Sequence, residues 1–342
     1  MALNLTALGL GRYLPCSILS RKPYVLAAYD YDFLDCLDAF EQVLPRNQMV
    51  TLLIQLGWQC QTANTAKKLV KGLRAARERL PQIGRILMLA NEPEEVTALS
   101  AQGEEAVFCH QNAFLDERRY PVLPFVRKRY DAIYVARITP FKRHALLSEM
   151  SKVRLIGTFS ENERTYAESI LQNREHVRWS NWYPAHLIAI PMNQARCGLC
   201  LSAEEGAMFV SAEYLLCGLP VVNTPNIGGR DLVMPDFAVK RVAAETSAVA
   251  DAVRQWQVAA PPAADIREAT LSLMRPHRRK LLEILQEIGV AEELCEKYAR
   301  RFPHKLGLRC SRSPLQNLAI GLPRPDKQEG AGCRVQGAGV EE

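Results

Sequence analysis

The stretch SAEEGAMFVSAEYLLCGLPVVNTPNIGGRD, residues 202–231, decides the fold. It follows an apolar segment at 197–201 that is typical of a buried strand. It then contains an acid-bearing turn, a helical segment, a second apolar strand and a Gly-Gly loop. This order predicts a βαβ unit of a parallel sheet, with its polar groups at one edge. Open α/β sheets bind ligands at that edge, beyond the carboxyl ends of their strands.

Two acids and two glycines of this stretch indicate the ligand. Glu205 and Glu213 stand eight residues apart, a little over two helical turns, so both point toward roughly the same side. Gly228-Gly229 lets backbone N–H groups approach an anion closely. Carboxylates accept hydrogen bonds from sugar and ribose hydroxyls, and N–H groups hold a diphosphate. The pattern therefore suits a nucleoside-diphosphate sugar.

The same residues resemble the donor-binding signature of retaining glycosyltransferases of family 4 (glycosyl transferases group 1). That signature runs S-x-x-E-G, a second Glu eight residues after the first, G-x-P-V-V and G-G. The matching residues are Ser202, Glu205, Gly206, Glu213, Gly218, Pro220-Val221-Val222 and Gly228-Gly229. From the residues alone, a buried βαβ unit with two solvated glutamates stays open as an alternative.

Length and composition fit a soluble globular protein with two domains. The chain has 342 residues, 48% hydrophobic and 23% charged, with a net charge of +6. This charge suits an anionic ligand or an acidic membrane surface, and no nucleic-acid motif accompanies it. The ten cysteines lack a disulfide-scaffold spacing, and Cys197 and Cys200 fall in a core strand. We expect a cytoplasmic protein, either free or peripheral to a membrane, because no signal peptide or membrane span is evident.

Alternating strands and helices divide the chain into four parts. Expected strands lie at 23–29, 49–55, 85–90, 106–110, 131–137, 153–157, 176–179, 197–201 and 237–242, and expected helices include 33–44, 62–80, 161–172 and one from Lys142. The parts are an irregular lead-in (1–22), a short N-terminal Rossmann-like acceptor domain (23–125), a C-terminal Rossmann-like donor domain (126–302) and a tail (303–342) whose composition predicts disorder. The resemblance implies the GT-B fold, two parallel-sheet domains that face a central cleft.

Arg137 and Lys142 flank a strand-to-helix turn at the same predicted sheet edge. Either alone would be an ordinary surface cation. They resemble the Arg-x4-Lys pair that the family places on the donor diphosphate, where Arg binds bidentately and Lys acts as a point charge.

The resemblance implies a metal-independent transfer that needs no cofactor, with retention at the anomeric carbon. Arg137, Lys142 and the Gly228-Gly229 amides would stabilise charge on the departing diphosphate. Glu205 would hold the donor sugar, within a pocket that includes Gly206, Ala207 and Met208. Glu213 would bind the ribose. The partners would be a nucleotide sugar and a glycan or other hydroxyl acceptor, with no nucleic acid.

Several features depart from the family pattern. The family usually has E-G-F-G, where this chain has Met208 in place of the second glycine, and Asp231 stands near a common Glu. The first domain is short and lacks a Gly-Gly loop after its first strand. His110 is either a contact to the transferred sugar or a hydrogen-bonded structural histidine. Trp179, Trp182 and Tyr183 either stack on the base or pack in the core.

Other classes of function remain open on the sequence. A catalytically silent GT-B scaffold would bind a nucleotide sugar or a protein partner without transfer, and Met208 and the short first domain favour it. The intact set of Arg137, Lys142, Glu205 and Glu213 favours an enzyme. A sugar-nucleotide epimerase or a phosphorylase would need further groups, and neither set is evident.

Overall fold

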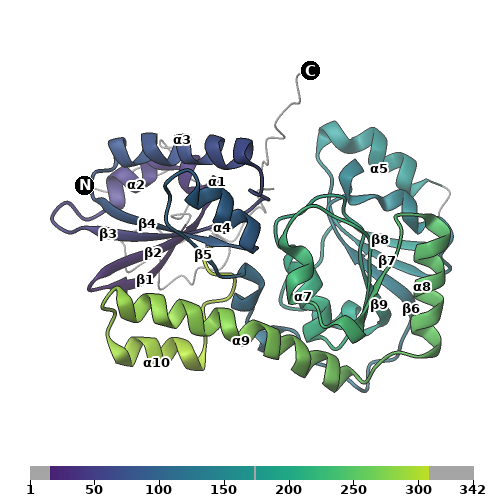
Figure 1. Ribbon diagram of the computed structural model, residues 1–342. Helices are drawn as coiled ribbons and strands as arrows, with labels where there is room; N and C mark the ends of the chain where they lie inside the picture. Colours follow the sequence, from purple (N-terminus) through teal and green to yellow (C-terminus); the bar gives the residue numbers. More distant parts are fainter. Residues whose placement is uncertain (1–15, 173–174, 308–342) are drawn as a thin grey trace.

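The computed structural model describes residues 16–172 and 175–307 of the chain. Two parallel-sheet domains lie side by side, and one long helix runs beneath both (Figure 1). The predicted α/β architecture with two Rossmann-like domains is confirmed. The first fifteen residues and most of the predicted tail, from residue 308 onward, lie outside the described residues.

The first domain has a five-stranded sheet in the order β1-β2-β3-β4-β5. Strands β2 to β5 are parallel, whereas β1 pairs antiparallel with β2. The expectation of an irregular lead-in is therefore wrong for residues 17–21, a segment too short to show a periodicity of its own. The strands are β1 (Ser17–Arg21), β2 (Tyr24–Tyr29), β3 (Val50–Gln55), β4 (Ile83–Ala90) and β5 (Ala106–Phe108).

Helices cover both faces of this sheet, which explains why β3 and β4 are almost wholly apolar. Along β3, Leu52 and Ile54 pack into one core, while Leu53 between them packs into the core on the other face. The first face is covered by α1 (Asp30–Leu34), α2 (Leu37–Val43), α3 (Ala63–Arg79) and α4 (Pro93–Ser100), and the second by α10 (Glu292–Arg300) and part of α9 (Ala263–Glu287).

The single helix expected at 33–44 is two helices, and its first begins in the predicted loop at Asp30. The hydrogen-bond pattern tightens where they meet. The Asp35 N–H reaches the carbonyl of Tyr31, four residues back, but the Cys36 N–H reaches Phe33, only three back. The apolar spacing continues through this break, so the pattern alone does not reveal it.

The second domain has a six-stranded, all-parallel sheet in the order β11-β10-β9-β6-β7-β8. The chain starts at β6, moves outward to β8, and returns to β9 on the other side of β6. The order therefore reverses between β6 and β9, which is the place where such sheets bind ligands. The strands are β6 (Tyr130–Val135), β7 (Val153–Ile156), β8 (Val177–Ser180), β9 (Ala195–Cys200), β10 (Val221–Asn223) and β11 (Val239–Arg241).

The helix expected from Lys142 does not form. Two short 3-10 turns, Pro140–Lys142 and His144–Leu147, take its place. Arg143 between them has φ 53°, a left-handed conformation that interrupts any right-handed helix. The α-helices of this domain are α5 (Arg164–Leu171), α6 (Ala189–Asn193), α7 (Phe209–Leu216) and α8 (Thr246–Val258).

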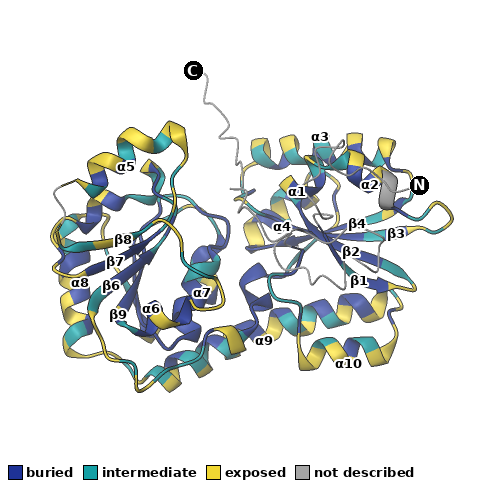
Figure 2. Cartoon of the chain, turned by 180° about the vertical axis from the view of Figure 1, so that it is seen from behind, coloured by how far each residue is buried: buried dark blue, intermediate teal, exposed yellow. Residues whose placement is uncertain are grey.

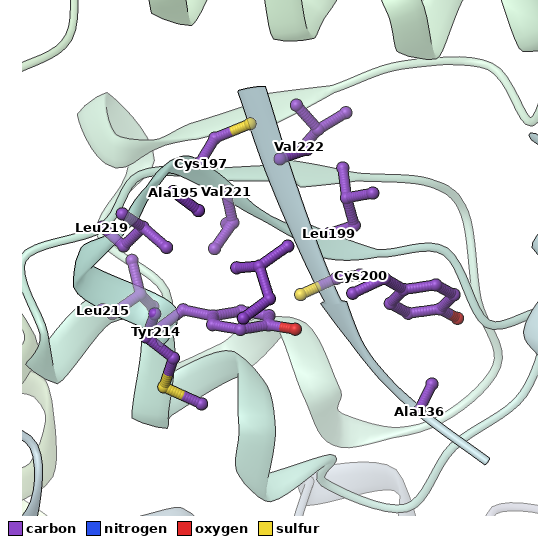
Figure 3. Close-up of a cluster of buried hydrophobic side chains, with 14 of the residues drawn as sticks. Ala136, Ala195, Cys197, Leu199, Cys200, Tyr214, Leu215, Leu219, Val221 and Val222 are labelled. Atoms are coloured by element: carbon purple, nitrogen blue, oxygen red, sulfur yellow. The ribbon is translucent and has the colours of Figure 1, made fainter. Parts of the chain in front are cut away.

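The core of the second domain lies between α7 and the strands β9 and β10. Figure 3 shows Tyr214 and Leu215 of α7 facing the side chains of these strands. A side chain at Gly198 would overlap the ring of Tyr214, so glycine is required there for the helix to reach the sheet. Cys197 and Cys200 are fully buried in β9, as a core interpretation of the CxxC spacing expects.

The long helix α9 joins the two domains (Figure 2). Near its start, Ile266 and Met274 belong to the second domain's core, whereas Leu281 and Leu285 pack against the first sheet. The chain thus returns to the first domain through α9 and α10. Within residues 16–172 and 175–307, no helix is both long and apolar enough to cross a membrane.

Candidate active site at the domain boundary

The carboxyl ends of the two sheets face each other across the domain boundary. From the second domain come Arg137 after β6, Glu205 after β9 and Gly228 after β10. From the first domain come loops that follow β3, β4 and β5, at residues 57–59, 91–92 and 109–112. These strand ends bring the predicted site residues to one edge of the second sheet.

Lys142 and Glu205 form an ion pair. Their side chains are 14% and 8% exposed, so water screens the pair only weakly. The backbone holds both partners in place, because the Tyr134 hydroxyl donates to the Lys142 carbonyl at 2.6 Å and the Ala203 N–H donates to the Phe141 carbonyl at 2.8 Å. The structure thus joins two residues that are 63 positions apart in the chain.

Arg137 follows β6, but it points toward the neighbouring strand β7 and away from Lys142. Its Nη2 lies 3.3 Å from Oε1 of Glu163, in the loop after β7, and its side chain is 33% exposed. Arg137 and Lys142 therefore stand on opposite sides of the β6 end, each beside one glutamate. A diphosphate placed across this strand end would meet both cations.

Arg230, which the sequence analysis did not single out, holds the loops of this edge together. Its side chain is fully buried. The guanidinium donates to the carbonyls of Cys200 (3.3 Å), Ser202 (3.2 Å) and Thr224 (2.5 Å), and its Nε pairs with Asp231 at 2.8 Å. Because a buried guanidinium needs such partners, Arg230 fixes the spacing between the ends of β9 and β10. Its position directly after Gly228-Gly229 is the only sequence signal for this role.

The two glycines of the loop are both sterically required. Gly228 has φ 115°, and a side chain there would overlap the Glu205 carbonyl. A Cβ atom at Gly229 would lie 2.6 Å from the carbonyl oxygen of Asn91 in the first domain. The loop therefore packs beneath Glu205 on one side and against the other domain on the other side.

His110 lies under the same loop and is completely buried. Its Nδ1 accepts a hydrogen bond from the Asn112 N–H at 3.2 Å, so the proton is on Nε2, which donates to the Gly229 carbonyl at 2.9 Å. Burial lowers the pKa of His110 to about 3 and keeps the ring neutral, with a smaller lowering from nearby His277. This geometry matches the structural alternative for His110, as a residue that positions the glycine loop.

Glu213 is buried in α7, where two side chains bind its Oε1 atom. The Tyr120 hydroxyl donates at 2.8 Å, and Nζ of Lys305 lies at 3.0 Å. Burial, together with the negative charge of Glu213, raises the pKa of Tyr120 and keeps its proton on the phenol. Lys305 arrives from the segment after α10, at residues that the sequence placed in a structureless tail. Both of these contacts use Oε1, so Oε2 is the oxygen that would face a ligand hydroxyl.

The segment Gly206–Met208 crosses from Glu205 to the start of α7. Asn112 of the interdomain segment donates from Nδ2 to the Ala207 carbonyl at 2.7 Å. Met208 has φ 44°, in the place where the family pattern has a glycine. Among the described non-glycine residues, positive φ occurs at Arg143, Met208 and Lys305, and all three adjoin the residues described above. Such strained backbone concentrates at functional sites.

The two domains touch at this edge. A Cβ atom at Gly206 would lie 2.9 Å from the carbonyl oxygen of Gly57. Oε1 of Glu204 accepts hydrogen bonds from Nε1 of Trp58 (3.1 Å) and Nε2 of Gln59 (3.0 Å). Where the sequence predicts a cleft, the loops are thus in direct contact at these positions.

Other features lie away from this edge or take no part in it. Trp179 stacks with Phe159 and donates to the Gly157 carbonyl at 2.9 Å, while Trp182 is 70% exposed. A hollow of about 400 Å³ along α3 is lined by Lys67, Lys71 and neighbours, and no predicted site residue borders it. In the described part of the chain, no three His, Cys, Asp or Glu side chains gather in a way that could hold a metal ion.

Comparison with known proteins gives the fold its name. No protein-family model and no curated protein matches the sequence. The Anabaena protein HepE, solved in complex with UDP and glucose, is 15% identical, with a TM-score of 0.57 over 76% of this chain and 77% of its own. In complex with UDP-glucose, HepE gives a TM-score of 0.57 at 15% identity, over 77% and 79% of the two chains. The α,α-trehalose 6-phosphate synthase of Burkholderia multivorans is 13% identical, with a TM-score of 0.50 over 77% and 71%. At these identities the likeness shows the fold alone, and the fold is GT-B.

Proposed function

We propose that this chain is a glycosyltransferase that moves a sugar from a nucleoside-diphosphate sugar to an acceptor hydroxyl, as a step of glycan assembly. The observation that carries the proposal is the ion pair of Lys142 with Glu205, near Arg137, at the place where the strand order of the second sheet reverses. Cations held there suit an anionic leaving group, and a carboxylate next to them suits sugar hydroxyls.

In the proposed mechanism, Arg137 and Lys142 bind the donor diphosphate and stabilise the negative charge that grows as it departs. Lys142 has three N–H donors, so it can keep its bond to Glu205 while it binds a phosphate oxygen. Glu205 is thereby held in position to accept hydroxyls of the donor sugar. No metal ion or other cofactor is part of this mechanism, because the two cations neutralise the diphosphate.

The remaining donor contacts follow the same edge. Glu213, oriented by Tyr120 and Lys305, binds the ribose through Oε2. The backbone N–H groups of Gly228-Gly229 bind the diphosphate, and His110 and Arg230 fix that loop. Gly206, Ala207 and Met208 border the sugar pocket, which the Met208 side chain narrows relative to a glycine.

We further propose that transfer retains the anomeric configuration, with a departing phosphate oxygen taking the acceptor proton on the same face of the sugar. The support is the resemblance of the Ser202–Gly229 region to retaining family 4 enzymes. Because HepE was solved with UDP-glucose, UDP-sugars are the first donors to test.

We further propose that the enzyme lies in the cytoplasm, either free or bound to the membrane surface. Six cysteines are free thiols, namely Cys60, Cys109, Cys197, Cys200, Cys217 and Cys295. The net charge of +6 suits an anionic surface. Fractionation of cells that express the tagged chain would test both parts of this placement.

A catalytically silent scaffold is the second candidate, and the direct contacts of Gly206 with Gly57 and Gly229 with Asn91 favour it. A donor that binds between the domains would have to separate loops that are in contact. Transfer therefore requires that the Gly206–Gly57 and Gly229–Asn91 contacts open when the donor binds, whereas a scaffold can keep them closed.

Calorimetric titration with UDP, GDP and ADP and with their common sugars tests the proposal. We expect one nucleotide to bind wild type and the exposed control Glu293→Gln equally, and Glu213→Gln more weakly. Ligand at a hundredfold excess over its dissociation constant would also raise stability by about 2.7 kcal/mol. Proton NMR of the transferred or hydrolysed sugar, with EDTA present, then reports configuration and metal independence. Absence of nucleotide binding would refute the transferase and favour a scaffold that binds a protein partner. Nucleotide binding without turnover on any acceptor would favour a scaffold that binds a nucleotide sugar.

A further inference from the structure

The first domain places an exposed tryptophan opposite the Lys142–Glu205 pair. Trp58 follows β3 and is 41% exposed. It contacts the chain neighbours of both charged residues: its Nε1 donates to Glu204, and its ring meets Phe141 at a centroid distance of 5.7 Å. These two rings are perpendicular, at 87°, so Phe141 covers at most one face of the indole. The ring is thus fixed in orientation and still accessible.

A second aromatic ring and a carboxylate lie beside it. Asp30 and Tyr31 follow β2, which is the parallel neighbour of β3. Oδ1 of Asp30 accepts a hydrogen bond from the Gly57 N–H at 2.9 Å. A side chain at Gly57 would overlap the Tyr31 ring, so this ring lies directly against the Gly57 backbone, and it is 39% exposed. Two ring surfaces and one carboxylate therefore gather around Gly57.

Gly57 also connects this cluster to the proposed transfer site. Its carbonyl is the group that a Cβ atom at Gly206 would approach to 2.9 Å, and Gly206 directly follows Glu205. A molecule resting on Trp58 and Tyr31 would accordingly lie on the first-domain side of the same edge at which the donor is proposed to bind. A transfer requires its acceptor on that side, because the donor occupies the other.

The chemistry of the cluster selects one class of ligand. A pyranose ring has an apolar face of C–H groups and a rim of hydroxyls. Fixed aromatic rings stack on such a face, and a carboxylate accepts hydrogen bonds from the rim. An alkyl chain would offer the Asp30 carboxylate no hydrogen bond beyond the one from the Gly57 N–H, and it would remove water from that charge, which is costly.

We propose that Asp30, Tyr31 and Trp58 form an acceptor subsite for a pyranose sugar, so that the acceptor is a glycan end. This inference rests on the proposed function and adds its acceptor class. Burial raises the pKa of Asp30 to about 6, partly offset by the Gly57 N–H, so the carboxyl is ionised at neutral pH and accepts from a hydroxyl. Glu204 accepts the indole N–H of Trp58 and thereby fixes the ring, so Glu204 is a positioning residue.

Saturation-transfer NMR on the full chain tests the subsite, with the methyl glycosides of glucose, galactose, mannose and N-acetylglucosamine as probes. We expect saturation to reach the C–H protons of one ring face of at least one probe. Trp58→Leu should weaken that probe's binding about tenfold, whereas Trp58→Phe, which keeps a ring, should retain most of it. Phe125→Ala removes an aromatic side chain that is 99% exposed and lies in the segment before β6, and should change nothing.

A third variant separates this subsite from the donor pocket. Glu205→Gln should leave glycoside binding intact, because Glu205 serves the donor sugar. Loss of binding in Glu205→Gln but not in Trp58→Leu would overturn the proposal and place the probe in the donor pocket. Failure of every methyl glycoside to bind a protein that binds a nucleotide would also overturn it, while the proposed function would stand. Failure of nucleotide binding in the same samples would remove the proposed function itself.

Discussion

The ion pair between Lys142 and Glu205 makes a quantitative prediction. Removing one partner of a buried pair leaves an uncompensated charge, which costs about 3–5 kcal/mol in fully buried cases. Here the side chains are 14% and 8% exposed, so we expect Lys142→Met to lower the free energy of unfolding by about 3 kcal/mol, the lower end of that range. Lys142→Met/Glu205→Gln removes both charges and should recover most of this loss, for a coupling energy of about 2 kcal/mol.

Urea denaturation of the four proteins of this cycle, followed by circular dichroism, gives the coupling energy. Arg254 and Asp251 provide a matched control, since they form an ion pair whose side chains are 58% and 60% exposed. Their coupling should stay below about 1 kcal/mol. Equal coupling in the two cycles would refute the claim that Lys142 and Glu205 are shielded from water. Calorimetry with the bound nucleotide then asks whether Lys142→Met weakens binding, as its proposed role on the diphosphate requires.

Three further predictions concern the residues around this pair. Gly229→Ala should destabilise the contact between the domains by about 1–3 kcal/mol, because the new Cβ atom would lie 2.6 Å from the carbonyl oxygen of Asn91. Small-angle scattering should then show a larger radius of gyration. An unchanged radius of gyration together with unchanged stability would contradict this. Tyr120→Phe removes the hydrogen bond to Glu213 and should lower the free energy of unfolding, measured by thermal denaturation, by about 1 kcal/mol. It should also weaken nucleotide binding, because Glu213 is no longer held in position. An effect on stability alone would contradict the proposed contact of Glu213 with the ribose. His110 has a folded pKa of about 3 against an ordinary value of 6.5, so its stabilisation is complete well above pH 6.5 and is lost as the pH falls toward 3. Wild type should therefore lose about 2 kcal/mol more than His110→Gln between about pH 8 and about pH 5, and parallel stability curves for the two proteins would contradict this.

The sequence predicts those parts of the fold that depend on local pattern. The apolar strands of 49–55 and 85–90 and the helix of 62–80 appear within a residue or two of their predicted ends, because both faces of the sheet and one face of the helix must be apolar. The residues of the 202–231 stretch likewise meet at one sheet edge, since successive parallel strands end together. What the pattern leaves out is the strand at 17–21, which gains its hydrogen bonds from a neighbour.

The partners that complete the site could not be predicted, because they come from distant parts of the chain. Tyr120 and Lys305 meet on Glu213 from positions 93 residues before it and from beyond the last helix. Trp58 meets Glu204 across 146 positions. A periodic pattern contains no information on such contacts, and the buried guanidinium of Arg230 looks in the sequence like any surface cation.

The positions of backbone strain bear on whether the site is active. A left-handed conformation at a non-glycine residue costs on the order of 1 kcal/mol or more, and a glycine would remove most of that cost. The described non-glycine residues with positive φ are Arg143, which follows Lys142, Met208, which begins α7, and Lys305, which binds Glu213. Their side chains do work that glycine could not do: Arg143 binds the Pro225 carbonyl at 2.9 Å, Met208 packs in the core and Lys305 orients a carboxylate. Strain that is spread over a fold would have no such meaning. Here the strain lies at three points beside one edge of the second sheet. This is what an enzyme needs when the exact placement of its two cations, Arg137 and Lys142, and its two acids, Glu205 and Glu213, matters more than stability.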